Sequence, residues 1–331
     1  MPLRWTFFWV LTFATANSYA SLQPASVERR PAVWRKSISQ QCVYDTAFGQ
    51  FLEGQKEGIY VSGANITWAW NANICKYQTM SREEMLSYLW GRHVHLIGDS
   101  NLRFMYQRLI FYVTGVSIIA PKMEDSKEVY VEGERSITME FYWSPSMTWT
   151  LPRLEKLVPK RRDLFIFNNN LHDCRPDSKP NFYRSRLHLL SSICDKWVVE
   201  KEKNTTETEE QEEDPKMEPI AFWMSPVKVI EANHKKGKAA AAGWLANSQM
   251  YWDIVQREGM LAPLGHFRPL DVSQMLTYAP EQAYRCCYEN GKRHAIHLDD
   301  QVYDIVWQFF FNSLKHSPFS SGSVLANKKT L

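Results

Sequence analysis

Residues 93–112 read HVHLIGDSNLRFMYQRLIFY, and this stretch decides the fold. Its first part, 93–98, predicts a short buried strand, and apolar residues then recur every three to four positions over 102–113, as one face of a helix requires. A tight turn at Gly98 joins the two. A strand, turn and helix in this order place Ser100 at the C-terminal edge of a sheet.

Ser100 stands where the predicted helix begins. The free N–H groups and the dipole of a helix N-terminus favour developing negative charge, which is what an acyl-transfer nucleophile requires. Asp99 and Ser100 are also ordinary helix-capping residues, so capping is the alternative interpretation. The strand-to-helix position, with Arg103 three residues later, favours the catalytic one.

Composition indicates a globular chain. The sequence has 331 residues, of which 44% are hydrophobic and 14% aromatic, enough for one large core. The net charge is +3 and the basic residues are scattered, so we expect no nucleic-acid partner.

The N-terminal segment predicts where in the cell the protein is delivered. Residues 1–20 combine Arg4, an apolar run and the small-residue end Ser-Tyr-Ala20, which is typical of a secretory signal peptide. An uncleaved Golgi-type anchor is the alternative, and only then would the chain contact a membrane. Residues 21–41 predict a stem or arm, and residues 316–331 a C-terminal tail. We expect a secreted protein or one of the secretory-pathway lumen.

The cysteines fit an oxidising compartment. They are Cys42, Cys75, Cys174, Cys194, Cys286 and Cys287. We expect disulfides Cys42–Cys75 and Cys174–Cys194, and leave the vicinal pair unassigned. No Cys-x-x-Cys pair and no zinc-ligand spacing occurs, so we expect no metal and no cofactor. Asn65 and Asn204 begin glycosylation acceptor sequences.

The remaining pattern predicts an α/β domain over 80–315 with a mostly parallel sheet. Buried strands are predicted at 163–168 and 220–224 and within 260–272, and helices from Ser81 to about residue 89, at 181–197, at 244–258 and from Asp299. Residues 42–79 predict a loop-rich flap closed by its disulfide. Residues 200–218 contain nine acidic and three basic residues and predict a disordered surface insertion.

A serine nucleophile needs a base, and His297 is the candidate. It precedes the predicted last helix and has the apolar neighbours Ile296 and Leu298. A metal site made by His294 and His297 is the alternative, but no further ligand is spaced to complete it.

These motifs resemble the SGNH (GDSL-like) hydrolases, and within them the PC-esterase group of trichome-birefringence-like and NXPE-like proteins. The resemblance covers about residues 42–315. It is carried by Trp68-x-Trp70 with Cys75, by Gly98-Asp-Ser100-x-x-Arg103, by the Asn-containing block 163–173 and by Phe222-Trp-Met-Ser-Pro226.

The resemblance implies a three-layer α/β/α sandwich with Ser100 as the nucleophile. It implies an oxyanion hole made by the Ser100 N–H and Asn168 or Asn170, with Asp99 and Arg103 in support. It also implies that the chain is an O-acetyltransferase or an esterase acting on carbohydrate, so the expected partner is a carbohydrate or acyl-ester substrate.

One position departs from that family's pattern. Its last block is Asp-x-x-His, whereas this chain has His294-Ala-Ile-His297. An orienting aspartate fixes the imidazole tautomer and stabilises its charged form. Asp271, Asp299 or Asp300 could substitute, or His294 could accept the Nδ1 hydrogen bond. The rival interpretation is a catalytically inactive protein that binds glycans or another partner.

Overall fold

The computed structural model describes a defined part of the chain, all of it within the compact unit Ser37–Leu331. The described residues are 49–53, 59–61, 66–70, 78–160, 162–168, 170–174, 179–205, 220–229, 238–261, 266–276, 283–285, 294 and 296–315. The predicted signal peptide, stem and tail therefore lie outside them.

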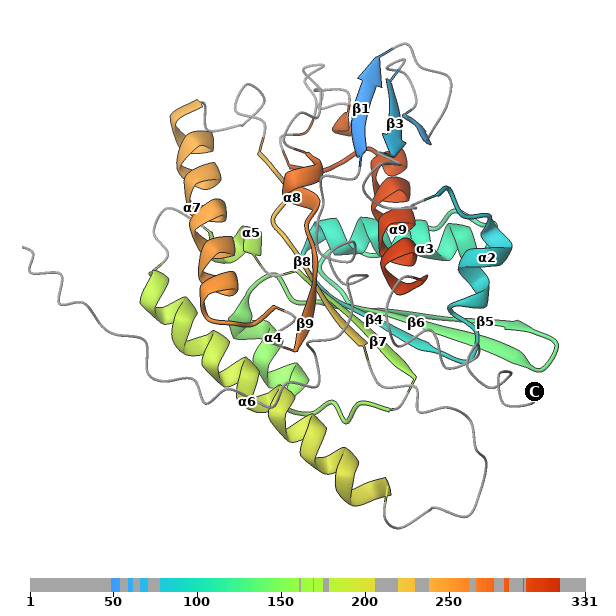
Figure 1. Ribbon diagram of the computed structural model, residues 1–331, viewed down its shortest axis with the longest axis horizontal. Coiled ribbons are helices and arrows are strands. Elements are labelled where there is room, and N and C mark those ends of the chain that lie inside the picture. Colours follow the sequence, from blue (N-terminus) through green and yellow to red (C-terminus); the bar gives the residue numbers. More distant parts are fainter. Residues whose placement is uncertain are drawn as a thin grey trace, which may run out of the picture. The chain divides into compact units, whose positions relative to one another are not determined.

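A six-stranded sheet is the centre of the domain (Figure 1). Its order is β5-β6-β4-β7-β8-β9, and every neighbouring pair is parallel except β5 with β6. The strands are β4 (His93–Gly98), β5 (Ser126–Glu132), β6 (Arg135–Trp143), β7 (Asp163–Asn168), β8 (Ile220–Met224) and β9 (Phe267–Leu270). The predicted mostly parallel α/β sheet is confirmed.

Helices cover both faces of this sheet (Figure 1). One core cluster joins the sheet to α2 (Arg82–Ser87), α3 (Ser100–Thr114) and α9 (Asp300–Lys315). The second joins it to α4 (Met147–Leu154), α6 (Pro180–Thr205) and α7 (Lys238–Arg257). Two short helices, α5 (Asn170–Asp173) and α8 (Val272–Met275), follow β7 and β9. None of the described helices has the length and apolarity that crossing a bilayer needs.

Alternation along the strands explains the two clusters. Leu96 of β4 packs into the first cluster and Ile97 into the second, because successive side chains point to opposite faces. The strand β7 is buried on both faces, as a central parallel strand requires, whereas β6 alternates between buried and half-buried positions.

The N-terminal flap differs from the prediction. Its described backbone is a three-stranded antiparallel sheet, β1 (Gly49–Glu53), β3 (Ile66–Trp70) and β2 (Ile59–Val61), in the order β1-β3-β2. The β-branched and aromatic residues of ITWAW and IYV favour strands over the predicted loops. The strand β2 lies against α9. Cys42, Cys75 and Asn65 lie outside the described residues, so the flap disulfide stays a prediction.

Two helices extend beyond their predicted ends. The helix α6 continues to Thr205, so the first six residues of the predicted disordered insertion are helical, and Asn204 lies in the last turn. Glu200 and Lys203 are strong helix formers spaced as an i,i+3 pair in the sequence. Adding these residues to an existing helix therefore costs little free energy. The helix α7 begins six residues before the predicted start because the run KAAAA has high helix propensity.

The predicted Cys174–Cys194 disulfide is absent from the structure. Both residues are free thiols buried in the second core cluster. Burial raises the pKa of each thiol, so both stay protonated and pack as small apolar side chains. Cys286 and Cys287 lie outside the described residues.

Candidate active site

Ser100 lies at the junction of β4 and α3. The strand ends at Gly98, Asp99 is the N-cap of α3, and Ser100 is the first helical residue. The Asp99 side chain accepts a hydrogen bond from the Asn101 N–H at 2.8 Å. This cap keeps the helix N-terminus, with its free N–H groups, directly beside the half-buried Ser100 side chain.

Gly98 makes this junction possible. A Cβ atom at this position would lie 2.1 Å from the Asn168 carbonyl oxygen and 2.9 Å from Leu102 Cδ1. No side chain fits there, so β7 can pass directly beside the turn that carries Ser100. The close approach therefore explains why glycine precedes the Asp-Ser pair.

The structure brings Ser100 and His297 together. Ser100 Oγ lies 2.8 Å from His297 Nε2, although 197 positions separate the two residues in the chain. This is the distance at which an imidazole nitrogen can accept the serine proton. The predicted nucleophile and the predicted base therefore form a hydrogen-bonded pair.

Backbone hydrogen bonds hold the His297 segment. Residues 283–285 and 297–299 lie antiparallel, with the Arg285 N–H donating to the His297 carbonyl oxygen at 2.9 Å. The Asp299 N–H donates to the Ala283 carbonyl oxygen at the same distance. His297 thus has strand-like backbone support although the segment precedes a helix.

The Tyr303 hydroxyl ties this segment to α3. It donates to Asn101 Oδ1 at 2.6 Å and accepts from the Leu298 N–H at 3.3 Å. Tyr303 and Asn101 are fully buried. Because Asn101 follows Ser100 and Leu298 follows His297, this hydroxyl fixes the spacing between nucleophile and base.

An aromatic contact orients the His297 ring. Phe104, one turn along α3 from Ser100, makes an edge contact with the ring at 5.1 Å between centroids. The Arg285 guanidinium lies over the Phe104 ring, 4.0 Å from its centroid. Sequence reasoning did not single out Phe104, Tyr303, Asn101 or Arg285, and only the adjacency of Asn101 to Ser100 could have suggested one of them.

His294 faces the far side of the His297 ring. The two Nδ1 atoms lie 3.1 Å apart. His294 is also tied to the same backbone segment, since its N–H donates to the Arg285 carbonyl oxygen at 2.9 Å. His294, one of the alternatives that the sequence left open, therefore contacts His297 in the structure.

The three candidate aspartates have other contacts. Asp271 Oδ1 accepts a hydrogen bond from Ser225 Oγ at 3.0 Å. Asp299 accepts one from the Gln301 N–H and starts α9, and Asp300 pairs with Arg285. Each carboxylate thus has a structural contact of its own.

Asp99 and Arg103 are buried beside the pair. Burial raises the pKa of Asp99 to about 7. The hydrogen bonds that Asp99 accepts from the Asn101 and Leu102 N–H groups lower this pKa and so oppose the effect of burial. Arg103 Nη1 donates to the Ala120 carbonyl oxygen at 3.2 Å, and the guanidinium lies over the Phe104 ring. These contacts assign Arg103 to packing beneath the site.

The predicted oxyanion donors are only partly placed. Asn168 is fully buried at the end of β7, and its amide nitrogen lies 3.9 Å from Met224 Sδ. Asn170 begins α5, and its side chain lies outside the described residues. The oxyanion role of both therefore stays a prediction.

Solved structures show distant similarity. The aryl esterase of M. smegmatis is 8% identical, with 68% of this chain and 99% of that chain covered at a TM-score of 0.36. A carbohydrate acetylesterase from Sinorhizobium meliloti is 11% identical, with 68% and 98% covered at 0.35. A salicylyl-acyltransferase from a tetracycline biosynthetic pathway is 10% identical, with 76% and 57% covered at 0.35.

No protein-family model matches the sequence, and no curated protein matches it. The structural similarity to these esterases and this acyltransferase is distant. The chemistry of this chain is therefore argued from its own residues.

Proposed function

We propose that the chain is a serine-dependent acyl-transfer enzyme in which Ser100 is the nucleophile and His297 the base. The observation that carries this proposal is the 2.8 Å contact between Ser100 Oγ and His297 Nε2 at a helix N-terminus. A serine needs a neighbouring base to become nucleophilic, and the helix terminus stabilises the negative charge that then develops.

The reaction has two half-steps. Ser100 Oγ attacks the acyl carbonyl carbon while its proton passes to His297 Nε2, and the intermediate then collapses as the ester C–O bond breaks and His297 returns the proton to the alcohol. A water or sugar hydroxyl next attacks the acyl-Ser100, giving its proton to His297. The bond to Ser100 breaks and its oxygen takes that proton back.

The tautomer follows from the geometry. Because His297 Nε2 must accept the Ser100 proton, Nδ1 carries the hydrogen of neutral His297 and donates it to His294 Nδ1. His294 then carries its own proton on Nε2. His294 thus supplies the acceptor that an aspartate supplies in a serine-histidine-aspartate triad, but without the negative charge.

A fluorophosphonate tests this proposal, because it labels an activated serine whatever the substrate. We expect the wild type to be labelled at Ser100, Ser100→Ala to be unlabelled and His297→Ala to be labelled roughly 10²-fold or more slowly. His188→Gln, which removes an exposed histidine on α6, is the matched control and should be labelled at the wild-type rate.

The second candidate is a protein that binds a ligand in this site without catalysis. The observation that favours it is that an imidazole, His294, contacts His297 Nδ1, where a carboxylate orients the base in a serine-histidine-aspartate triad. Equal absence of labelling in folded wild type, Ser100→Ala and His297→Ala would establish this candidate over the enzyme.

For the substrate, we propose an O-acylated carbohydrate, with hydrolysis or transfer of an acetyl group as the reaction. The support is the sequence resemblance to the PC-esterase group. Release of acetate from acetylated oligosaccharides, measured with wild type and Ser100→Ala, tests hydrolysis. Acetyl transfer to an added oligosaccharide in the same assay identifies a transferase.

For the location, we propose the secretory pathway. The support is the apolar segment before Ala20 and the acceptor sequences at Asn65 and Asn204. Expression in eukaryotic cells should give a glycosidase-sensitive mass that falls in Asn65→Gln and in Asn204→Gln. Unmodified protein in the cell lysate would contradict the location.

A further inference from the structure

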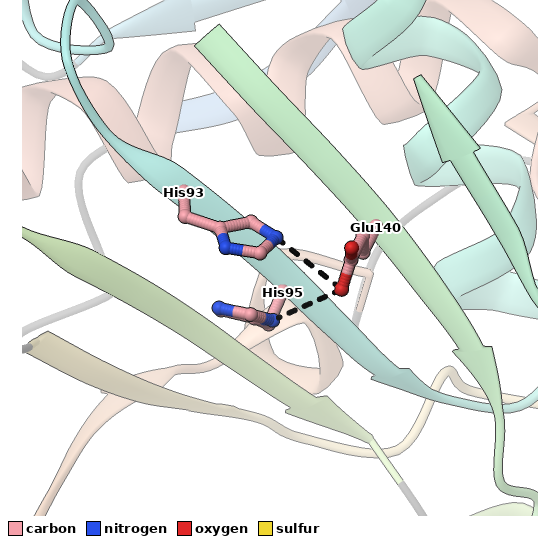
Figure 2. A group of neighbouring side chains, drawn as sticks. All are labelled: His93, His95 and Glu140. Carbon is pink, nitrogen blue, oxygen red and sulfur yellow. Dashed lines mark ion pairs between the residues drawn. The ribbon is translucent and has the colours of Figure 1, made fainter. Parts of the chain in front are cut away.

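A second cluster of ionisable side chains lies away from Ser100. It consists of His93 and His95 of β4 and Glu140 of β6, and Figure 2 shows both rings directed toward the Glu140 carboxylate. His93 begins β4, whereas Gly98 ends it. At about 3.3 Å per residue, His93 lies roughly 17 Å along the strand from the end that leads to Ser100.

Sheet register creates the cluster. His95 is directly opposite Glu140 in the parallel pair β4–β6. His93 and His95 are two positions apart, so their side chains share one face of the sheet. The His-x-His pattern was visible in the sequence, but Glu140, 45 positions after His95, became a neighbour only through strand pairing.

The distances fit a tetrahedral metal ion. His93 Nε2 lies 3.2 Å and His95 Nδ1 3.7 Å from the same Glu140 oxygen, Oε2, and the three ligand atoms lie within 4.8 Å of one another. Zinc bonds of about 2.0–2.1 Å at tetrahedral angles place ligand atoms roughly 3.3–3.4 Å apart. Both distances to Glu140 Oε2 lie within a few tenths of an ångström of this spacing, and the two histidine ligand atoms are at most 4.8 Å apart.

His95 is held in the orientation of a metal ligand. Its ring is 2% exposed and stacks on Phe165 at 4.6 Å between centroids. Its Nε2 lies 3.6 Å from Asp163 Oδ2, on the side opposite Glu140. Metal-bound histidines commonly direct their second nitrogen at a carboxylate, which fixes the tautomer and leaves the other nitrogen free to bind the ion.

The cluster is accessible from one side. The His93 side chain is 27% exposed and that of Glu140 13%, so an ion can enter past His93. The buried His93 Nε2 faces Glu140 without forming a hydrogen bond of good geometry within the described residues. Such nitrogens are costly to bury without a partner, and an ion would provide one at His93.

Two further groups contact Glu140. Lys127 Nζ lies 2.6 Å from the other oxygen, Oε1, and can stay there while Oε2 binds an ion. The Tyr142 hydroxyl donates to Oε2 and lies 3.5 Å from His95 Nδ1. A metal ion bound to Oε2 would replace the hydrogen bond from Tyr142. The competing arrangement is therefore a hydrogen-bond network that contains no metal.

We propose that His93, His95 and Glu140 bind a divalent transition-metal ion of the zinc class and tie β4 to β6. Imidazole nitrogens with one carboxylate suit this class, and zinc accepts four-coordinate geometry without a preference of its own. The ion takes no part in the proposed acyl transfer, because its site lies at the opposite strand ends from Ser100. This revises the expectation of no metal and does not depend on the proposed function.

Calorimetric titration of the chelator-treated full chain with Zn²⁺, and the visible absorption of bound Co²⁺, test the proposal. We expect one ion per chain and the intense bands of four-coordinate Co²⁺. His93→Gln and Glu140→Gln should lose at least tenfold in affinity, and Asp163→Asn roughly 10–100-fold. Zn²⁺ should raise the Tm of the wild type but not that of His93→Gln.

The matched control is His188→Gln, which removes an imidazole 3.3 Å from Glu258 Oε2 and should bind as the wild type does. His297→Ala should also bind normally, which separates this site from the His294–His297 pair. Equal affinity in wild type and His93→Gln would overturn the proposal. Because His93 is partly exposed, His93→Gln remains informative even if a variant of the more buried residues does not fold.

Discussion

The Nδ1 atoms of His294 and His297 lie 3.1 Å apart, so a second imidazole backs the ring that contacts Ser100. Only one of the two atoms can carry a hydrogen in a neutral pair. When His297 accepts the serine proton, the new positive charge faces a neutral acceptor in His294. An aspartate at this position would stabilise that positive charge with its negative charge. We therefore expect Ser100 to react more slowly with His294 than it would with an aspartate there.

Substitution of His294 tests this relationship. We expect His294→Asp to raise the rate of fluorophosphonate labelling at Ser100 by tenfold or more, because a carboxylate stabilises the imidazolium. His294→Ala should lower the rate by roughly one to two orders of magnitude because His297 loses its Nδ1 acceptor. Equal labelling rates in all three proteins would show that His294 has no influence on the base.

Loss of the Tyr303 hydroxyl should affect both stability and reactivity. Tyr303→Phe leaves Asn101 Oδ1 and the Leu298 N–H without this partner in a buried place, which costs about 1–3 kcal/mol of the free energy of unfolding. Because the hydroxyl spaces Ser100 from His297, labelling of the folded protein should also slow several-fold. Urea unfolding and labelling kinetics measure the two effects.

Tyr284→Phe is the control for that experiment. Its hydroxyl donates to the Lys228 carbonyl oxygen at 2.7 Å, whereas that of Tyr303 bonds Asn101 and Leu298. It should reduce stability by a similar amount and leave labelling unchanged. If both variants were labelled at the wild-type rate, Tyr303 would have only a stabilising role.

Gly98→Ala should be strongly destabilising. Its Cβ would meet the Asn168 carbonyl oxygen at 2.1 Å, and a backbone atom cannot move aside as a flexible side chain can. We expect a loss of about 3 kcal/mol or more, the upper end of the cost of overpacking. Gly133→Ala meets no atom within 4 Å, and its φ of +61° should cost only about 1 kcal/mol.

Denaturant unfolding of both glycine variants measures this difference. Equal stability losses would show that β7 shifts to accommodate the added methyl group, and that its close approach does not require glycine at position 98.

Asp99 should make stability depend on pH. Its pKa is raised to about 7 by burial, whereas the ordinary value is 3.8. Between these values the folded chain retains a proton that the unfolded chain releases, so this residue makes the free energy of unfolding fall as pH rises from about 4 to about 7. Over this whole range the contribution of Asp99 changes by on the order of 4 kcal/mol.

Asp99→Asn measures that effect, because asparagine retains N-cap ability and does not ionise. The free energy of unfolding of Asp99→Asn minus that of wild type should rise between pH 5 and pH 7 and level off above pH 8. Parallel pH profiles for the two proteins would contradict the raised pKa.

Much of the fold could be predicted from the sequence, because it depends on interactions between residues that are close together in the chain. The strand 163–168 has the predicted bounds, and α2 begins after the predicted start at Ser81, which exchanges hydrogen bonds with Glu84 in a capping box. Both features depend on residues within a few positions of one another. The ends of α6 and α7 were misjudged because tertiary context and helix propagation, not a local stop signal, determine them.

The candidate site also has features that the sequence predicts and features that only the tertiary structure shows. The sequence by itself determined that Ser100 starts a helix after a buried strand, because hydrophobic period and capping are local. Only the tertiary structure decided that Ser100 Oγ meets His297 Nε2, that His294 contacts the Nδ1 of the His297 ring, and that Glu140 joins His93 and His95. These contacts connect distant segments, and their geometry exists only once strand pairing and core packing bring the backbones together.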